Sequence, residues 1–137
     1  MATIKKILNA HPRKSHVDAD SFAKCAEELA NCSQACTACA DACLAEDSVG
    51  PLVRCIRTNL DCADVCNAAG RLVARLTEYD WNLLESQLRA CVAACRICSA
   101  ECDKHASKHD HCKVCAAVCR DCAEVCDELV SEVPSRK

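Results

Sequence analysis

The sequence predicts an all-α protein, an antiparallel up-down-up-down four-helix bundle with a short N-terminal arm or helix. Three observations support this prediction. The 137 residues include only two glycines, three prolines and three aromatic residues, a composition that disfavours a β-rich fold. Clusters of turn-forming residues divide the chain into four segments of helical length. Within each segment cysteines recur three, four or seven residues apart, the spacing that aligns side chains on one face of an α-helix.

The N-terminal part, residues 1–19, is interpreted as an arm in front of the bundle. A short helix is expected around residues 3–9, and it ends before Pro12 because the residue preceding a proline disfavours the helical conformation. The arm is basic, and we interpret its Lys and Arg side chains as a solvated face rather than a nucleic-acid patch. The net charge of −3 and the scarcity of aromatic side chains also argue against a nucleic-acid partner.

Four long helices are expected, separated by the turn-forming stretches DSVGP, TEYD and SKHD. Short connections force consecutive helices to run antiparallel, which makes the four-helix bundle the simplest architecture. The bundle is expected to form one domain over residues 20–131, followed by a C-terminal tail over residues 132–137. The predicted helices cover residues 20–46, 51–76, 81–106 and 111–130.

Residues suited to helix capping precede three of these segments. Gly50 followed by Pro51 suits the N-cap and the first helical position of the second helix. Asp80 and Asp110 are expected to cap the third and fourth helices, because an Asp side chain can accept a hydrogen bond from a first-turn amide.

Each predicted helix carries one row of cysteines. The stretch CSQACTACADAC, residues 32–43, places four thiols at steps of four, three and four, which confines them to a strip roughly 60° wide. Four such rows on four helices are expected to meet at the bundle axis. The rows consist of Cys25, Cys32, Cys36, Cys39 and Cys43; Cys55, Cys62 and Cys66; Cys91, Cys95, Cys98 and Cys102; and Cys112, Cys115, Cys119, Cys122 and Cys126.

Large aliphatic residues stand beside the rows, which argues against cysteine serving only as a small buried apolar residue. Ile97, Val118 and Val125 are examples. They are expected to cover either the seams between helices or an outer face used for self-association, and the sequence leaves both alternatives open.

Disulfide and redox chemistry fit the rows poorly. Thiols three or four residues apart on a helix have Cβ atoms about 5 to 6 Å apart, whereas a disulfide needs roughly 3.5 to 4.5 Å. CxxC pairs occur, but without the βαβ pattern of thioredoxin-like proteins and without a loop-borne Fe–S signature. No P-loop, dinucleotide fingerprint or Ser, His and Asp arrangement is present either, so we expect no enzyme.

Metal binding is the remaining chemistry, and thiolate sulfur selects soft ions such as Cu(I) and zinc. A zinc ion held by four thiolates leaves a dianionic site, so four such sites would bury about eight negative charges at a heavy desolvation cost. Thiolates that bridge about one Cu(I) each leave the core neutral. We therefore predict a multinuclear Cu(I)–thiolate core, with a zinc or mixed-metal thiolate protein as the alternative.

The two ends of the predicted bundle differ. Alternating helix directions place His105, His109 and His111 at one end, together with Cys43, Cys55, Cys102 and Cys112. These histidines are candidate metal ligands at a mouth, and His105 is the preferred one because it follows Cys102 by three residues. The opposite end is expected to be an apolar plug of Phe22, Leu72, Leu76, Trp81, Leu84 and Leu129.

The expected compartment is the cytoplasm. The N-terminus lacks the apolar core of a signal peptide, and no stretch approaches the roughly 20 apolar residues of a membrane span. Thiols stay reduced in the cytosol, where cysteine clusters indicate metal or redox chemistry. No membrane partner is expected.

The chain resembles the cytosolic copper storage proteins from about residue 22 to residue 130. The resemblance depends on CSQACTACADAC, on CVAACRICSAEC in the third predicted helix, on CKVCAAVCRDCAEVC in the fourth, and on the histidine-rich link KHASKHDHC. It implies a four-helix bundle whose core holds many Cu(I) ions, assembled as a homotetramer without a signal peptide. It also implies that all seventeen cysteines are ligands. The sparse second row, with Thr58 or Asn59 where a further thiol might stand, leaves the copper count open.

Overall fold

The protein is described by a computed structural model over residues 2–13 and 19–132, and these residues form helices with no strand among them. The predicted tail, apart from Glu132, lies outside the described residues, as do residues 14–18 of the predicted arm. The elements are α1 (Ala2–Asn9), α2 (Ala19–Leu44), the 3₁₀ turn η1 (Gly50–Leu52), α3 (Val53–Val73), α4 (Trp81–Asp103) and α5 (Asp110–Glu132).

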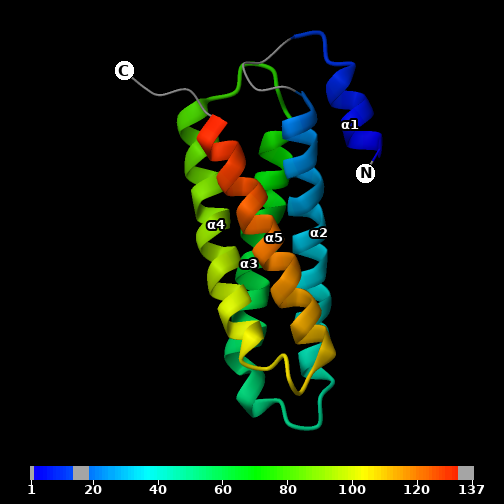
Figure 1. Ribbon diagram of the computed structural model, residues 1–137, viewed down its shortest axis with the longest axis vertical. Coiled ribbons are helices and arrows are strands. Elements are labelled where there is room, and N and C mark those ends of the chain that lie inside the picture. Colours follow the sequence, from blue (N-terminus) through cyan, green and yellow to red (C-terminus); the bar gives the residue numbers. More distant parts are fainter. Residues whose placement is uncertain (1, 14–18, 133–137) are drawn as a thin grey trace.

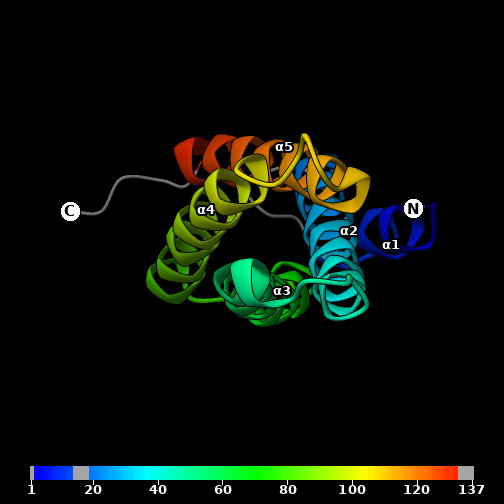
Figure 2. The ribbon, with the colours of Figure 1, turned by 90° about the horizontal axis from the view of Figure 1, so that it is seen from below.

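Helices α2 to α5 form an antiparallel up-down-up-down bundle, as the sequence predicts. The α2–α3 and α4–α5 connections lie at one end, and the α3–α4 connection lies at the other (Figure 1). Viewed along the bundle, the four helices surround a common axis, and α1 lies outside them against α2 (Figure 2). Each of the four long helices therefore has one inward face, and these four faces enclose the site described below.

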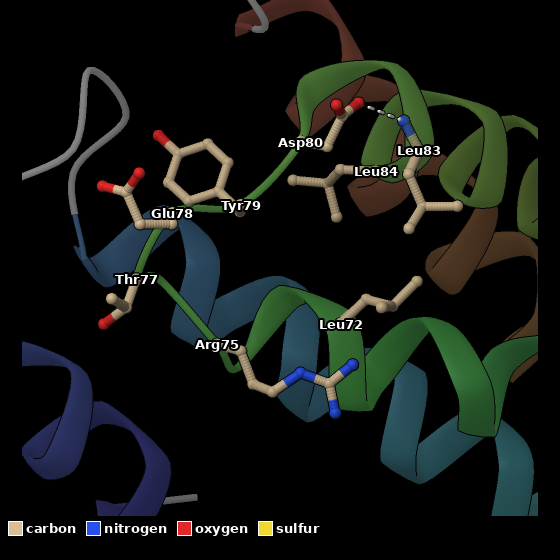
Figure 3. Close-up of a pocket in the computed structure, with 8 residues that line it drawn as sticks. All are labelled: Leu72, Arg75, Thr77, Glu78, Tyr79, Asp80, Leu83 and Leu84. Carbon is tan, nitrogen blue, oxygen red and sulfur yellow. Dashed lines mark hydrogen bonds between the residues drawn. The ribbon is translucent and has the colours of Figure 1, made fainter.

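The starts of the helices agree only in part with the predicted caps. Asp80 caps α4 as expected, because its Oδ1 accepts a hydrogen bond from the backbone N–H of Leu83 at 3.1 Å (Figure 3). Gly50 and Pro51 instead belong to the turn η1, which precedes α3. The fixed φ of proline suits a 3₁₀ first turn as well as an α-helical one.

Asp110 is the first residue of α5 and not the residue before it. Its carboxylate still lies where the helix dipole favours a negative charge. The first three long helices end at residues 44, 73 and 103, two to three residues before the predicted ends. The periodicity of a sequence predicts helix ends less precisely than helix positions. The ends of α2 and α4 lie next to the histidine-bearing end of the bundle.

The end of the bundle at the α3–α4 connection is closed by apolar side chains. Phe22 is 1% exposed, and its ring centroid lies 5.9 Å from that of Tyr79. Tyr79 in turn meets Trp81 edge to face at 4.6 Å. Leu84 and Leu129 are buried as well, whereas Trp81 is only partly buried. The predicted plug is thus present, with Phe22 as its best-buried aromatic residue.

A surface hollow of about 310 Å³ adjoins this plug between α3 and α4 (Figure 3). Neither cysteine nor histidine lines this hollow, so it is not part of the thiol rows. Its lining residues are Leu72, Arg75, Thr77, Glu78, Tyr79, Asp80, Leu83 and Leu84.

The short N-terminal helix is docked on the bundle. Leu8 is 3% exposed and belongs to the core, while Lys5 and Lys6 remain exposed as expected of a solvated basic face. Asn9 Nδ2 donates a hydrogen bond to Asp20 Oδ1 at 3.0 Å. Among the helices of the described ranges, none has the length and apolar character needed to cross a bilayer.

Candidate metal centre

The four rows of thiols meet inside the bundle. All seventeen cysteines are free and buried. Sulfur atoms from different helices approach closely: Cys36 Sγ lies 3.5 Å from Cys119 Sγ, and Cys66 Sγ lies 3.6 Å from Cys95 Sγ. This convergence follows from the sequence, because the rows occupy the inward face of every long helix and carry only small side chains.

The sulfurs form overlapping groups of four, in which all donor atoms lie within 4.8 Å of one another. Two metal–sulfur bonds of about 2.3 Å span at most roughly 4.6 Å, so one ion can bridge most neighbouring pairs. Cys32, Cys36 and Cys119 each belong to two groups, which means that the groups are linked through shared sulfurs. The three groups are Cys32, Cys66, Cys95 and Cys122; Cys32, Cys36, Cys62 and Cys119; and Cys36, Cys98, Cys115 and Cys119.

Three further thiols lie toward the apolar plug. Cys126 interacts with both Cys25 and Cys91, and Cys91 Sγ also donates to the backbone carbonyl of Val65 at 3.6 Å. The rows therefore continue from the central groups almost to the closed end of the bundle.

Asn59 lies among the thiols as the one buried amide of the described core. It is 0% exposed, and its Oδ1 accepts hydrogen bonds from Cys98 at 2.9 Å and Cys115 at 3.2 Å. Its Nδ2 donates to Cys55 Sγ at 3.7 Å. In the sequence, position 59 stands out only as a gap in the second row of cysteines. The available signal was the spacing itself, because residue 59 continues that row between Cys55 and Cys62.

The other end of the bundle holds the histidines. His111 Nδ1 lies 3.3 Å from Cys39 Sγ and 3.6 Å from Cys112 Sγ. These donors, together with Cys43, lie within 4.8 Å of one another. The structure thus brings His111 to the thiol rows, and we call the group of Cys39, Cys43, His111 and Cys112 the mouth group.

His105 and His109 contact carboxylates at the same end. His105 Nε2 lies 3.1 Å from Glu101 Oε2, and His109 Nδ1 lies 3.0 Å from Glu46 Oε2. His105 was preferred from the sequence, but the contacts described for it are with this carboxylate, whereas those of His111 include two thiols.

The carboxylates at this end are held in their charged form. Burial alone raises the pKa of Glu101, but hydrogen bonds from His105 and Lys104 outweigh it and lower the pKa. The hydrogen bond from His111 lowers the pKa of Glu46. Burial alone lowers the pKa of His111, but its hydrogen bonds with Cys39 and Glu46 outweigh that effect and raise it. Glu46 and Glu101 are therefore ionised near neutral pH and act as hydrogen-bond acceptors for the mouth histidines.

Burial favours the protonated form of two thiols of the mouth group, Cys43 and Cys112, at neutral pH. It raises the pKa of Cys43 from the ordinary 9.0 to about 11, and it raises the pKa of Cys112 as well. The pKa of Cys55 is lowered by its hydrogen bond with Cys102, but the bond with Cys39 and burial raise it overall to about 12. A metal that binds here must displace protons.

Raising the pH above about 9 is expected to destabilise the metal-free protein, because thiols of the unfolded chain ionise there while Cys43 and Cys55 stay protonated in the fold. Their contribution to stability is complete below pH 9.0 and declines as the pH rises toward about 11 to 12. Urea unfolding followed by circular dichroism at pH 7.5, 9 and 10.5, with reductant and chelator present, measures this decline. The Cu(I)-loaded protein is the control, since its thiolates have no proton to lose. A midpoint that is the same at all three pH values in the metal-free protein would contradict the expectation.

Comparison with known proteins agrees with this geometry. The structure is similar to that of the copper storage protein Ccsp from Streptomyces lividans loaded with 10 copper equivalents, with a TM-score of 0.91 and 46% identity over 93% of this chain and 98% of that one. A second similar structure, of a cytosolic copper storage protein from Streptomyces lividans with five coppers, gives a TM-score of 0.80 and 50% identity over 82% of this chain and 93% of that one.

A curated relative is the uncharacterized cysteine-rich protein YhjQ of Bacillus subtilis strain 168, which is 35% identical over 59 residues, or 43% of this chain. The match spans about half of that relative, 49% of its length. The model of the copper storage protein family matches residues 18–131, which include α2 to α5 except for the last residue of α5. The chain belongs to the copper storage protein family.

Proposed function

We propose that this chain stores Cu(I) in the cytosol, in a multinuclear thiolate core that fills the bundle over residues 20–131. The observation that supports this most is the sharing of sulfurs between the four-thiol groups, since shared sulfurs are what bridged copper clusters require. The similar Streptomyces lividans proteins, named as copper storage proteins and in one case as cytosolic, support the same cargo and compartment.

The proposed ligands are the seventeen cysteines together with the Nδ1 atom of His111. His105 and His109 are proposed to receive copper at the mouth. Asn59 Oδ1 accepts hydrogen bonds from protonated thiols in the metal-free state, and its oxygen is available to a copper ion once those protons leave. No catalytic step is proposed for any of these groups.

A homotetramer is proposed as the assembled form, on the resemblance described above. Exposed large apolar side chains on the outer faces of the bundle are compatible with self-association, and they include Val53 and Leu60 on α3 and Ile97 on α4. Sedimentation of the metal-free and loaded protein tests this assembly independently of the cargo.

Titration with Cu(I) under anaerobic conditions is expected to saturate at on the order of one ion per thiol, because bridging sulfurs serve more than one ion. Zinc is expected to stop at no more than about four ions per chain, since each tetrahedral ion takes four thiolates. Metal analysis of the desalted protein after loading with both ions measures the two capacities, and acid release in weak buffer follows thiol deprotonation. Saturation near four coppers would exclude the bridged core and favour a zinc-type thiolate protein.

A further inference from the structure

One carboxylate oxygen joins two of the mouth histidines. Glu46 lies in the α2–α3 connection, two residues past the end of α2. Its Oε2 is 3.0 Å from His109 Nδ1 and 2.8 Å from His111 Nε2. The two rings are stacked, with centroids 5.5 Å apart and planes 22° apart. Glu46, in the α2–α3 connection, therefore contacts the imidazole rings of both His109 and His111, which lie where α5 begins.

This contact decides which nitrogen of His111 is available to a metal. A ring nitrogen that donates its hydrogen to a carboxylate leaves the other nitrogen with the lone pair. For His111 the donating atom is Nε2, so the lone pair is on Nδ1, the atom that lies 3.3 Å from Cys39 Sγ. Metal-binding histidines commonly have such a carboxylate partner, which fixes the ring orientation and raises ligand basicity.

We propose that Glu46 is a positioning residue for copper loading: it fixes His111 as the Nε2–H tautomer, with Nδ1 directed to the mouth group, and holds His109 beside it. This inference rests on the proposed storage of Cu(I). Glu46 does not touch the copper itself and acts through the imidazole rings.

Glu101 shows how a purely structural carboxylate differs. It also accepts from a histidine, His105, but it is 6% exposed and is paired with Lys104 at 3.2 Å and Arg54 at 3.4 Å. The contacts described for Glu46 are with His109 and His111 alone. Its removal is therefore expected to affect the rings and leave the core intact.

Three variants separate positioning from simple charge removal. Glu46→Ala removes the acceptor, Glu46→Gln keeps an acceptor oxygen without the charge, and Asp47→Ala removes the neighbouring exposed carboxylate as the matched control. The tautomer of His111 is read from long-range ¹H–¹⁵N spectra of the metal-free protein. Copper binding at the mouth group is read from the His111 Nδ1 signal during titration against a Cu(I) chelator.

We expect wild type, Glu46→Gln and Asp47→Ala to show the Nε2–H form, and Glu46→Ala to show a mixture of tautomers. Copper binding at His111 should weaken about tenfold or more in Glu46→Ala, the usual range for losing such a partner, with total capacity unchanged. In a background in which His109 and His111 are both replaced by Ala, copper binding is followed instead by loading rate. There the additional Glu46→Ala change should have little further effect.

An unchanged tautomer and unchanged copper binding in Glu46→Ala would overturn the proposal. A full additional loss from Glu46→Ala in this double-histidine background would overturn it as well, because Glu46 would then act by another route. The tautomer measurement needs no metal, so it remains informative if wild type binds few Cu(I) ions and the storage function itself is wrong.

Discussion

Filling the core with Cu(I) is expected to raise the unfolding temperature of the chain by tens of degrees. An ion that binds only the folded state stabilises it by about 2.7 kcal/mol when its free concentration is 100 times its dissociation constant. Even about ten such ions, fewer than one per thiol, add on the order of 25 kcal/mol, and each kcal/mol shifts the unfolding temperature of a domain of this size by roughly 2 to 8 °C. Binding of copper to cysteines of the unfolded chain reduces this gain. Thermal scans by circular dichroism at increasing copper per chain measure it.

The metal-free protein is the reference for that experiment and is itself expected to be helical. Burial favours the protonated form of thiols such as Cys43 and Cys112, and the buried cysteines pack as small apolar groups with Leu29, Leu88 and the other buried aliphatic residues. Stripping copper with a strong Cu(I) chelator should restore the original unfolding temperature. A rise of only a few degrees at full loading would place the copper outside the core. A metal-free coil that becomes helical only with copper would instead indicate folding on binding.

The fold and the thiol rows could be predicted because one periodicity determines both. Cysteines at helical spacing fix which face of each helix turns inward, and four inward faces can only converge on the bundle axis. Asn59 shows the limit of this argument. Its position in the second row was visible, but a contact of 2.9 Å to Cys98 depends on the side-chain rotamer and on the offset between α3 and α4 along the axis.

The mouth was predicted less well because two helices end early. His105 was placed on the face of Cys102 by continuing helical spacing, yet α4 ends at Asp103, so that spacing no longer applies at residue 105. Glu46 is the last residue of the first predicted helix, but α2 ends at Leu44. Because Glu46 lies in the connection after α2, its carboxylate contacts His109 and His111 at the start of α5. Contacts made by residues between the helices depend on the backbone conformation of those segments, which the helical periodicity of the sequence does not predict.

Replacing His105, His109 and His111 together with Ala is expected to slow Cu(I) uptake about tenfold or more, the size of effect seen when groups that support a metal site are lost. Imidazole is neutral above a pKa of about 6.5. It can therefore accept a metal without the proton loss that a buried thiol such as Cys43 requires. Final capacity should change little, because the cysteines remain. Stopped-flow uptake from a Cu(I) chelator measures the rate, and metal analysis at equilibrium measures the capacity.

The opposite end of the bundle supplies the control, because the plug that closes it is made of apolar and aromatic side chains. Phe22→Ala opens the plug at its best-buried ring and is expected to lower the free energy of unfolding by about 3 to 5 kcal/mol. If copper passes from the mouth group along the linked sulfurs, this variant should take up copper at close to the wild-type rate in spite of its lower stability. Faster uptake in Phe22→Ala together with unaltered uptake in the triple-histidine variant would show that copper reaches the thiols through the plug. Slow uptake in the triple-histidine variant alone assigns the route to the histidine end.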